Sequence, residues 1–195
     1  MRFPLILALA ALAAPLPAAA QSFSGGYAFL KAVRDRDAEK VDQAVKRDGP
    51  IIVNSRDPSS NETALHIVTR GRDLRYLAYL LSRGGDPNLR DNQGQTPLLL
   101  ATQLGWTEGM SVLLDGGAKP DIGNQLGETP LIRAIENRDL AAARLLLQRG
   151  ANPAKVHTGS GLSARDYAAR DPRAATILRE IDTLQPRKKA AVGPN

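Results

Sequence analysis

The chain has 195 residues and a formal net charge of +6, with 26 Lys and Arg against 20 Asp and Glu. It contains no cysteine, which excludes disulfide bonds and the lipid anchor of a lipoprotein. Two histidines without cysteine disfavour a zinc site, and an aromatic content of 4% leaves few platforms on which single-stranded nucleic acid stacks. We therefore expect no metal, no cofactor and no nucleic-acid partner, and we interpret the basic charge as a solvated surface.

The N-terminal segment has the organisation of a secretory signal peptide. One arginine follows the initiator methionine, an apolar run occupies residues 5–14, and small residues precede a cleavage site after Ala20. The run is too short to span a bilayer comfortably, because about 20 apolar residues are needed. We expect a cleaved signal peptide over residues 1–20, a linker over 21–26 and a periplasmic or secreted protein. A retained amphipathic anchor is the alternative, and the lack of cysteine would fit a cytosol equally well.

One short motif occurs three times at a fixed spacing. It reads Thr, then Ala or Pro, then Leu, and it starts at Thr63, Thr96 and Thr129, which is a period of 33 residues. The same period recurs in the glycines that close each unit, Gly84, Gly117 and Gly150. A repeat of this length predicts stacked units that bury their apolar faces on one another.

The middle copy indicates how one unit is built. Residues 91–95 have the composition of a tight turn, Thr96 stands at a helix N-cap position, and Pro97 follows at the first helical position. Gly105 ends this short helix, and a second helix begins near Thr107 and ends at a glycine pair. The predicted order within a unit is hairpin, helix, turn, helix and loop.

This pattern resembles the ankyrin repeat, whose motif runs Gly-x-Thr-Pro-Leu-His-x-Ala and then Leu-Leu and Gly-Ala-Asp. The match is carried by residues 63–66, 94–98 and 127–131, and a degenerate copy occupies 161–168. The resemblance implies an all-α ankyrin-repeat solenoid of helix-turn-helix repeats with β-hairpin or loop tips. It contains three clear repeats between divergent N- and C-terminal capping repeats.

The resemblance divides the chain into consecutive units. These are a cap over 27–56, repeats over 57–90, 91–123 and 124–156, and a C-terminal repeat over 157–185, which together form a repeat domain over 27–185. A basic flexible tail is expected over 186–195, and any membrane contact would be weak and made through this tail.

Little in the sequence favours catalysis. The resemblance gives His66 a structural role, in which it hydrogen-bonds the backbone and braces the hairpin. His157 lies near Ser163 and Asp166, but those two residues fit a helix capping box better than a catalytic triad. Residues 159–164 match the dinucleotide motif G-x-G-x-x-A without the strand that the motif requires. We expect no catalytic residue and no enzyme activity.

Three aromatic residues and one glycine have less obvious roles. Trp106 falls in a turn between helices, where packing across a repeat junction is favoured over a partner anchor. Tyr76 and Tyr79 lie three apart on a second helix, so we expect them to pack in the stack with a hydroxyl on the convex side. Gly109 occupies an apolar position inside a helix at a cost of about 1 kcal/mol relative to Ala, which predicts a soft point in the stack.

The resemblance also implies a binding surface, because hairpin tips and first helices line a concave groove in ankyrin stacks. Carried over residue by residue, this surface comprises Glu62, Arg70, Arg72, Asn92, Gln93, Gln95, Gln103, Leu104, Gln125, Leu126, Glu128, Arg133, Glu136 and Asn137. The set is polar and of both signs, with Leu104 and Leu126 as exposed apolar candidates, which suits a protein partner better than a small molecule. The alternative is that these residues only keep the solenoid soluble.

We therefore expect a non-enzymatic, exported protein-interaction module that binds one protein partner, of unidentified nature, through its concave face. The resemblance to short exported bacterial ankyrin-repeat proteins also suggests an accessory or regulatory protein of an envelope enzyme, for example an oxidative-stress enzyme such as catalase. An exported effector is a further alternative.

Overall fold

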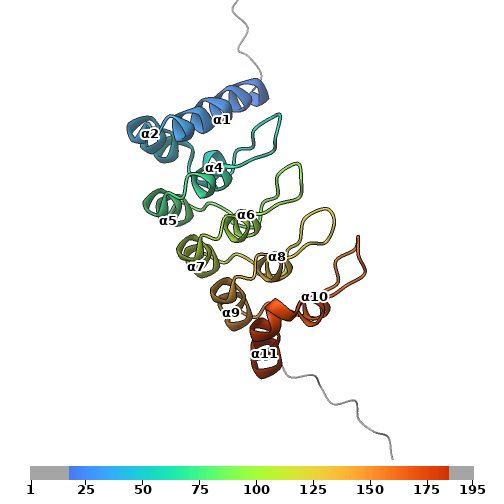
Figure 1. Cartoon of the computed structure of the whole chain (residues 1–195). Coiled ribbons are helices and arrows are strands. Elements are labelled where there is room, and N and C mark those ends of the chain that lie inside the picture. Colours follow the sequence, from blue (N-terminus) through green and yellow to red (C-terminus); the bar gives the residue numbers. More distant parts are fainter. Residues whose placement is uncertain (1–17, 185–195) are drawn as a thin grey trace, which may run out of the picture.

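The computed structural model describes residues 18–184, which form two stacked rows of helices (Figure 1). The inner row consists of α1 (Ala18–Arg34), α4 (Ala64–Arg70), α6 (Pro97–Gln103), α8 (Pro130–Glu136) and α10 (Ala164–Arg170). The outer row consists of α2 (Ala38–Asp48) with the short α3 (Pro50–Val53), α5 (Leu74–Ser82), α7 (Thr107–Asp115), α9 (Leu140–Gln148) and α11 (Ala175–Leu184), which the 3-10 turn η1 (Pro172–Ala174) precedes. The predicted all-α solenoid is confirmed.

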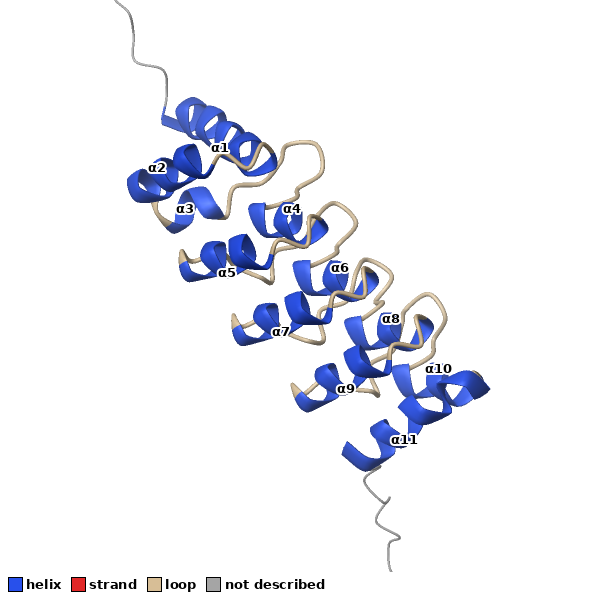
Figure 2. Ribbon diagram, turned by 60° about the vertical axis from the view of Figure 1, so that its left-hand side comes forward, coloured by secondary structure: helices blue, strands red, loops and turns tan. Residues whose placement is uncertain are grey.

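Hairpin loops project from the inner row beside each of α4, α6, α8 and α10 (Figure 2). Each is closed by a backbone hydrogen bond, such as the one from Asp91 N to Gln95 O at 2.9 Å. Within residues 18–184 these loops form no strand, and the one isolated bridge joins Val156 to Ser163. The projecting tips are therefore hydrogen-bonded loops, the second of the two forms that we expected.

The core lies between the two rows and continues from one repeat to the next. Leu98 of α6, Leu113 of α7 and Leu131 of α8 are fully buried within it. The predicted N-caps are also present, since Thr96 Oγ1 accepts a hydrogen bond from Leu99 N at 3.2 Å. Local capping thus starts each short helix at the point where its leucines face the neighbouring repeat.

The N-terminal cap differs from the sequence-based expectation. Helix α1 begins at Ala18 and therefore includes residues 21–26, which we expected to be a linker. Gly26 allows close packing there, since an added Cβ would lie 3.0 Å from Ser55 Oγ. Residues 1–17 of the expected signal peptide, and the expected basic tail, lie outside the described residues. None of the helices within 18–184 has the length and apolarity that a membrane span requires.

The Trp106 ring occupies the space that a side chain at position 109 would need. The Trp106 side chain is buried, as expected, and an added Cβ on Gly109 would lie only 2.1 Å from a carbon of its ring. Three other outer helices begin with an aspartate whose carboxylate accepts from the backbone three residues later, namely Asp37, Asp73 and Asp139. In α7, Trp106 stands at the cap position and makes no side-chain hydrogen bond to the helix, and its ring packs over Gly109. Gly109 is therefore a packing requirement of Trp106.

We predict that Gly109→Ala destabilises the protein by about 1–3 kcal/mol, although Ala is the better helix former, because the methyl group overlaps the indole. In a Trp106→Asp background the same change should instead stabilise by about 1 kcal/mol, because the indole that the methyl group overlaps is absent and Ala is the better helix former. Urea unfolding of the four proteins measures this change of sign. Ala142→Gly, at the corresponding position of α9, is the control and should cost about 1 kcal/mol. Equal effects of Gly109→Ala in both backgrounds would contradict the explanation.

Candidate functional site

The hairpins are built around an acceptor at their first position. Asp91 Oδ1 accepts hydrogen bonds from the backbone N–H groups of Gln93 and Gln95, both at 2.8 Å. Corresponding acceptors open the other hairpins, namely Asp57, Asn124 and His157. The residue type changes from repeat to repeat while the acceptor function is kept. Only the repeat period, combined with acceptor chemistry, could have revealed this from the sequence.

The hairpin tips are joined to one another by backbone hydrogen bonds. Asn92 N donates to Ser60 O at 2.8 Å, and Gln125 N donates to Gln93 O at 3.3 Å. Thr158 N donates to Leu126 O at 2.9 Å and continues the series. The tips therefore form one continuous ridge along the edge of the groove.

Two amide side chains predicted to contact a partner take part in this ridge. Asn92 Nδ2 donates to Ser59 O at 2.5 Å, and Gln125 Nε2 donates to Asn92 O at 2.7 Å. Their amide groups are thus occupied in joining neighbouring hairpins. This arrangement fixes the spacing of the tips and leaves less of each side chain for recognition.

A cavity of about 400 Å³ lies between the first two hairpins and the inner helices α4 and α6. We call it the groove cavity. Six members of the predicted surface line it, namely Glu62, Arg70, Asn92, Gln93, Gln95 and Gln103. Leu100, which corresponds in the other repeats to Ile67 and Arg133, also lines the cavity although it is only 3% exposed, and sequence reasoning did not identify it. The structure therefore brings the residues of the first two repeats together in one site.

The polar groups of the groove cavity are arranged in pairs. The Arg70 guanidinium forms an ion pair with Glu62, and Gln95 Nε2 donates to Gln103 Oε1 at 3.4 Å. The ion pair is largely open to solvent on its arginine side, so its contribution to stability is small. Both pairs can exchange partners when a polar ligand enters the groove.

In the third repeat, the predicted residues serve the fold more than the surface. Glu128 is buried, pairs with Arg133 at 2.5 Å and accepts from Asn124 Nδ2 at 2.9 Å. Arg133 also reaches Glu136, at 3.3 Å, and partial burial raises the pKa of the Glu136 carboxyl. Glu128 and Arg133 thus brace the hairpin on α8, and only Glu136 of the three is exposed.

The remaining predicted residues divide between contacts within the stack and exposed positions. The Arg72 guanidinium donates to the carbonyl of Leu104, and Asn137 Nδ2 donates to Thr102 O at 3.3 Å. Leu104 is half-buried against the core, so its expected exposure is wrong. Leu126, at a hairpin tip, is 59% exposed, as expected for a candidate apolar contact.

His66 lies fully buried beneath the groove cavity and joins two repeats. Its Nδ1 accepts from Thr63 N at 3.2 Å, so the ring proton lies on Nε2, which donates to Gln95 O at 3.0 Å. The expected structural role is confirmed. Burial lowers the pKa of His66, since a charged ring would lose solvation there.

This burial predicts a pH-dependent stability. As the pH falls below about 6.5, the unfolded chain binds a proton on His66 that the folded chain excludes, so the free energy of unfolding decreases. The decrease ends once the pH passes the lowered folded-state pKa. His66→Leu should lack this component, because leucine does not titrate. Repeat two carries Leu99 at the same position, so the repeat accepts leucine there.

Denaturant unfolding of both proteins between about pH 8 and pH 5 measures the effect. The stability difference between wild type and His66→Leu should shrink as the pH falls, while His157→Gln should follow the wild type. Parallel curves for wild type and His66→Leu would show that His66 is not the group responsible.

The geometry does not assemble a catalytic triad at His157. Its Nδ1 accepts from Ser160 N at 3.0 Å, and Ser163 Oγ donates to Asp166 at 2.6 Å as part of a helix capping box. The serine and aspartate therefore satisfy each other and a helix terminus. Among residues 18–184, no cluster of three or more His, Asp or Glu side chains is placed to hold a metal ion.

Comparison with known proteins agrees with this architecture. The family model described as ankyrin repeats (3 copies) matches residues 29–124 and 65–157. A viral relative, an ankyrin repeat protein of Acanthamoeba polyphaga mimivirus, is 43% identical over 49 residues. The matched stretch covers 25% of this chain and 7% of that relative, so the chain spans only a small part of its length.

Proposed function

Because the chain belongs to the ankyrin repeat family, whose repeats are generic protein–protein interaction modules, we propose that it binds a protein partner through its concave groove after export. The observation that carries the proposal is the convergence of six predicted surface residues on the groove cavity. The family is typically non-enzymatic, and the proposed role requires no catalytic group.

The character of the groove supports a protein partner. The Arg70–Glu62 pair and the glutamines beside it offer hydrogen bonds, and the largely buried Leu100 adds a small apolar contact. Leu126 adds an exposed apolar group further along the ridge of hairpin tips. Wet interfaces with a few apolar anchors have this composition.

We predict that a photoreactive residue at Gln103 forms one dominant crosslinked adduct in cells that express the full chain. Gln103 is exposed on α6 within the groove cavity, so a bound partner would lie against it. The same photoreactive residue at Gln148, exposed on the outer helix α9, is the matched control and should give no such adduct. Mass spectrometry of the adduct identifies the partner, including any client enzyme.

A charge reversal tests whether the groove itself is responsible. Arg70→Glu places two carboxylates together in the groove and should reduce the adduct by at least about fivefold. Arg149→Glu, which breaks an outer ion pair with Asp115, is the control and should leave the yield unchanged. Arg133 is unsuitable for this test, since its loss would leave the buried Glu128 without its ion pair. An adduct that survives Arg70→Glu at full yield would place the binding surface elsewhere.

Export is a separate part of the proposal and has its own prediction. Expressed with its native N-terminus in a bacterium, the protein should accumulate in the periplasmic fraction or the medium with Gln21 as its first residue. Intact-mass analysis of each fraction measures this. A full-length cytoplasmic protein that begins with Met1 would overturn the export proposal and leave the groove proposal intact.

A further inference from the structure

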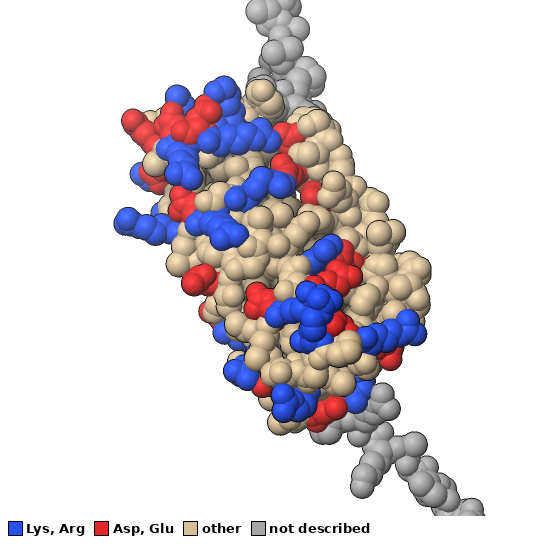
Figure 3. Space-filling model, viewed as in Figure 1, with Lys and Arg blue, Asp and Glu red and all other residues tan. Residues whose placement is uncertain are grey.

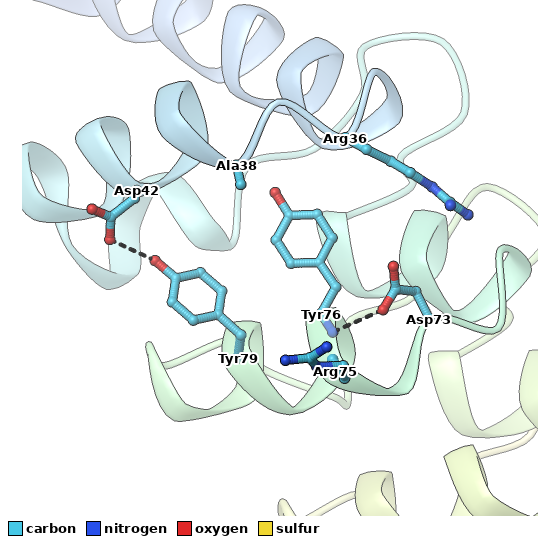
Figure 4. Close-up of a pocket in the computed structure, with 7 residues that line it drawn as sticks. All are labelled: Arg36, Ala38, Asp42, Asp73, Arg75, Tyr76 and Tyr79. Carbon is cyan, nitrogen blue, oxygen red and sulfur yellow. Dashed lines mark hydrogen bonds between the residues drawn. The ribbon is translucent and has the colours of Figure 1, made fainter.

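A second cavity, of about 490 Å³, opens on the outer side of the stack, between α2 and α5. We call it the outer pocket. Its walls come from Ala38 and Asp42 of α2 and from Arg75, Tyr76 and Tyr79 of α5 (Figure 4). It therefore lies between the N-terminal cap and the first repeat, on the row of helices opposite the hairpins. Its volume falls in the range of ligand-binding pockets, and it is open to solvent.

Two tyrosine rings give the outer pocket an apolar wall. The Tyr76 and Tyr79 ring centroids are 6.1 Å apart with the planes tilted by 30°. Tyr79 is fixed from both sides, because its hydroxyl donates to Asp42 Oδ1 at 3.1 Å and the Arg83 guanidinium lies 5.2 Å from its ring centroid. An aromatic or large aliphatic group can pack against this pair.

Both tyrosines pack against the core, as expected, but the other repeats do not use tyrosine at these positions. At the repeat period, Tyr76 corresponds to Gly109 and Ala142, whereas Tyr79 corresponds to Val112 and Leu145. The other junctions thus pack with small or aliphatic residues at the same positions.

Tyr76 also imposes a cost on the fold. Its hydroxyl is buried without a hydrogen-bond partner within the described residues, and burial raises its pKa to about 12. A residue that departs from the repeat pattern at a cost in stability is typical of a functional position.

The charge left available at the outer pocket is positive. Asp42 is paired with Lys46 at 2.6 Å as well as with Tyr79, and Asp73 accepts from Tyr76 N at 3.0 Å as the cap of α5. Asp42 is therefore neutralised by an ion pair, whereas Asp73 keeps its negative charge, and the two arginines that line the pocket outnumber it.

The arginines of the outer pocket have no such partners. Within residues 18–184, the side chains of Arg36 and Arg75 form no ion pair and no hydrogen bond, unlike Arg70 in the groove. Figure 3 shows Lys and Arg side chains gathered over this end of the molecule, with Asp and Glu among them. A ligand with carboxylates near an apolar group would satisfy the free guanidinium groups.

We propose that the outer pocket is a second docking site, which binds an acidic segment of a protein partner by receiving an aromatic side chain that has acidic neighbours. The aromatic group packs against Tyr76 and Tyr79, and the flanking carboxylates pair with Arg75 and Arg36. This site is independent of the groove, since no residue lines both cavities.

The test is an NMR titration of the full ¹⁵N-labelled chain with the peptide acetyl-Glu-Phe-Glu-amide. Amide shifts should be confined to α2, α5 and the turns beside them. Acetyl-Gln-Phe-Gln-amide and acetyl-Glu-Ala-Glu-amide should each bind at least about fivefold more weakly, because each lacks one half of the recognised chemistry. Equal binding of all three peptides, or no localised shifts, would overturn the proposal. Equally tight binding of 3-phenylpropionate would assign the pocket to small carboxylates instead.

Variants separate recognition from folding. Arg75→Gln should weaken the Glu-Phe-Glu peptide by about fivefold, and Arg170→Gln, an exposed arginine on α10, should not. Tyr76→Ala takes the residue found at this position in repeat three, so the stack should still fold while the apolar wall is lost. Its thermal unfolding serves as the folding control. Full peptide affinity in either Arg75→Gln or Tyr76→Ala would refute this docking site.

Discussion

The structure depends on hydrogen bonds that each repeat can complete only with its neighbour. Helices of seven residues such as α4 are too short to be stable alone, so every unit relies on the contacts beside it. Asn54 shows the pattern, since its amide donates to Gly84 O at 2.9 Å and accepts from Asp86 N at 2.8 Å. Asn88 makes the equivalent contacts one repeat later, with Gly117 and the residue two positions further on. Stability is then a sum of nearest-neighbour interfaces, and a local defect weakens one interface at a time.

The fold could be predicted because the residues that define a unit act within a few positions of themselves. Thr96 caps the helix that it precedes, and the repeat period then places every other element. Which side chains pair with one another in the groove depends on their rotamers in the stacked repeats, and composition does not encode these rotamers. Glu128 and Arg133 were expected at the surface because the family resemblance places their positions in the groove, yet they pair with each other and brace a hairpin. Gly109 was predicted to be a soft point because Gly is a poor helix former, and its contact with the Trp106 ring was not predicted.

The ridge of hairpin tips determines what the groove can recognise. The tips carry no charged residues, and the side chains of Asn92 and Gln125 are used to hold them in register. Charge appears instead where Glu62, which lies between the hairpin tip and α4, pairs with Arg70 of α4. A partner therefore meets a neutral, fixed edge first and a rearrangeable ion pair deeper in the groove. Such an arrangement favours specificity through polar complementarity over affinity through buried apolar area.

The repeat over residues 57–90 contributes to both cavities. Its inner helix α4 lines the groove cavity and its outer helix α5 lines the outer pocket, so each cavity bridges this repeat to a different neighbour. Ligands that span two units of a solenoid stabilise the interface between them. Occupation of the groove would strengthen the junction with the following repeat, and occupation of the outer pocket the junction with the cap. Tyr76 stands where the other repeats carry Gly109 and Ala142, and on the opposite face Arg70 stands where they carry Gln103 and Glu136. The proposed recognition positions therefore vary from repeat to repeat, while the leucines that pack the stack recur.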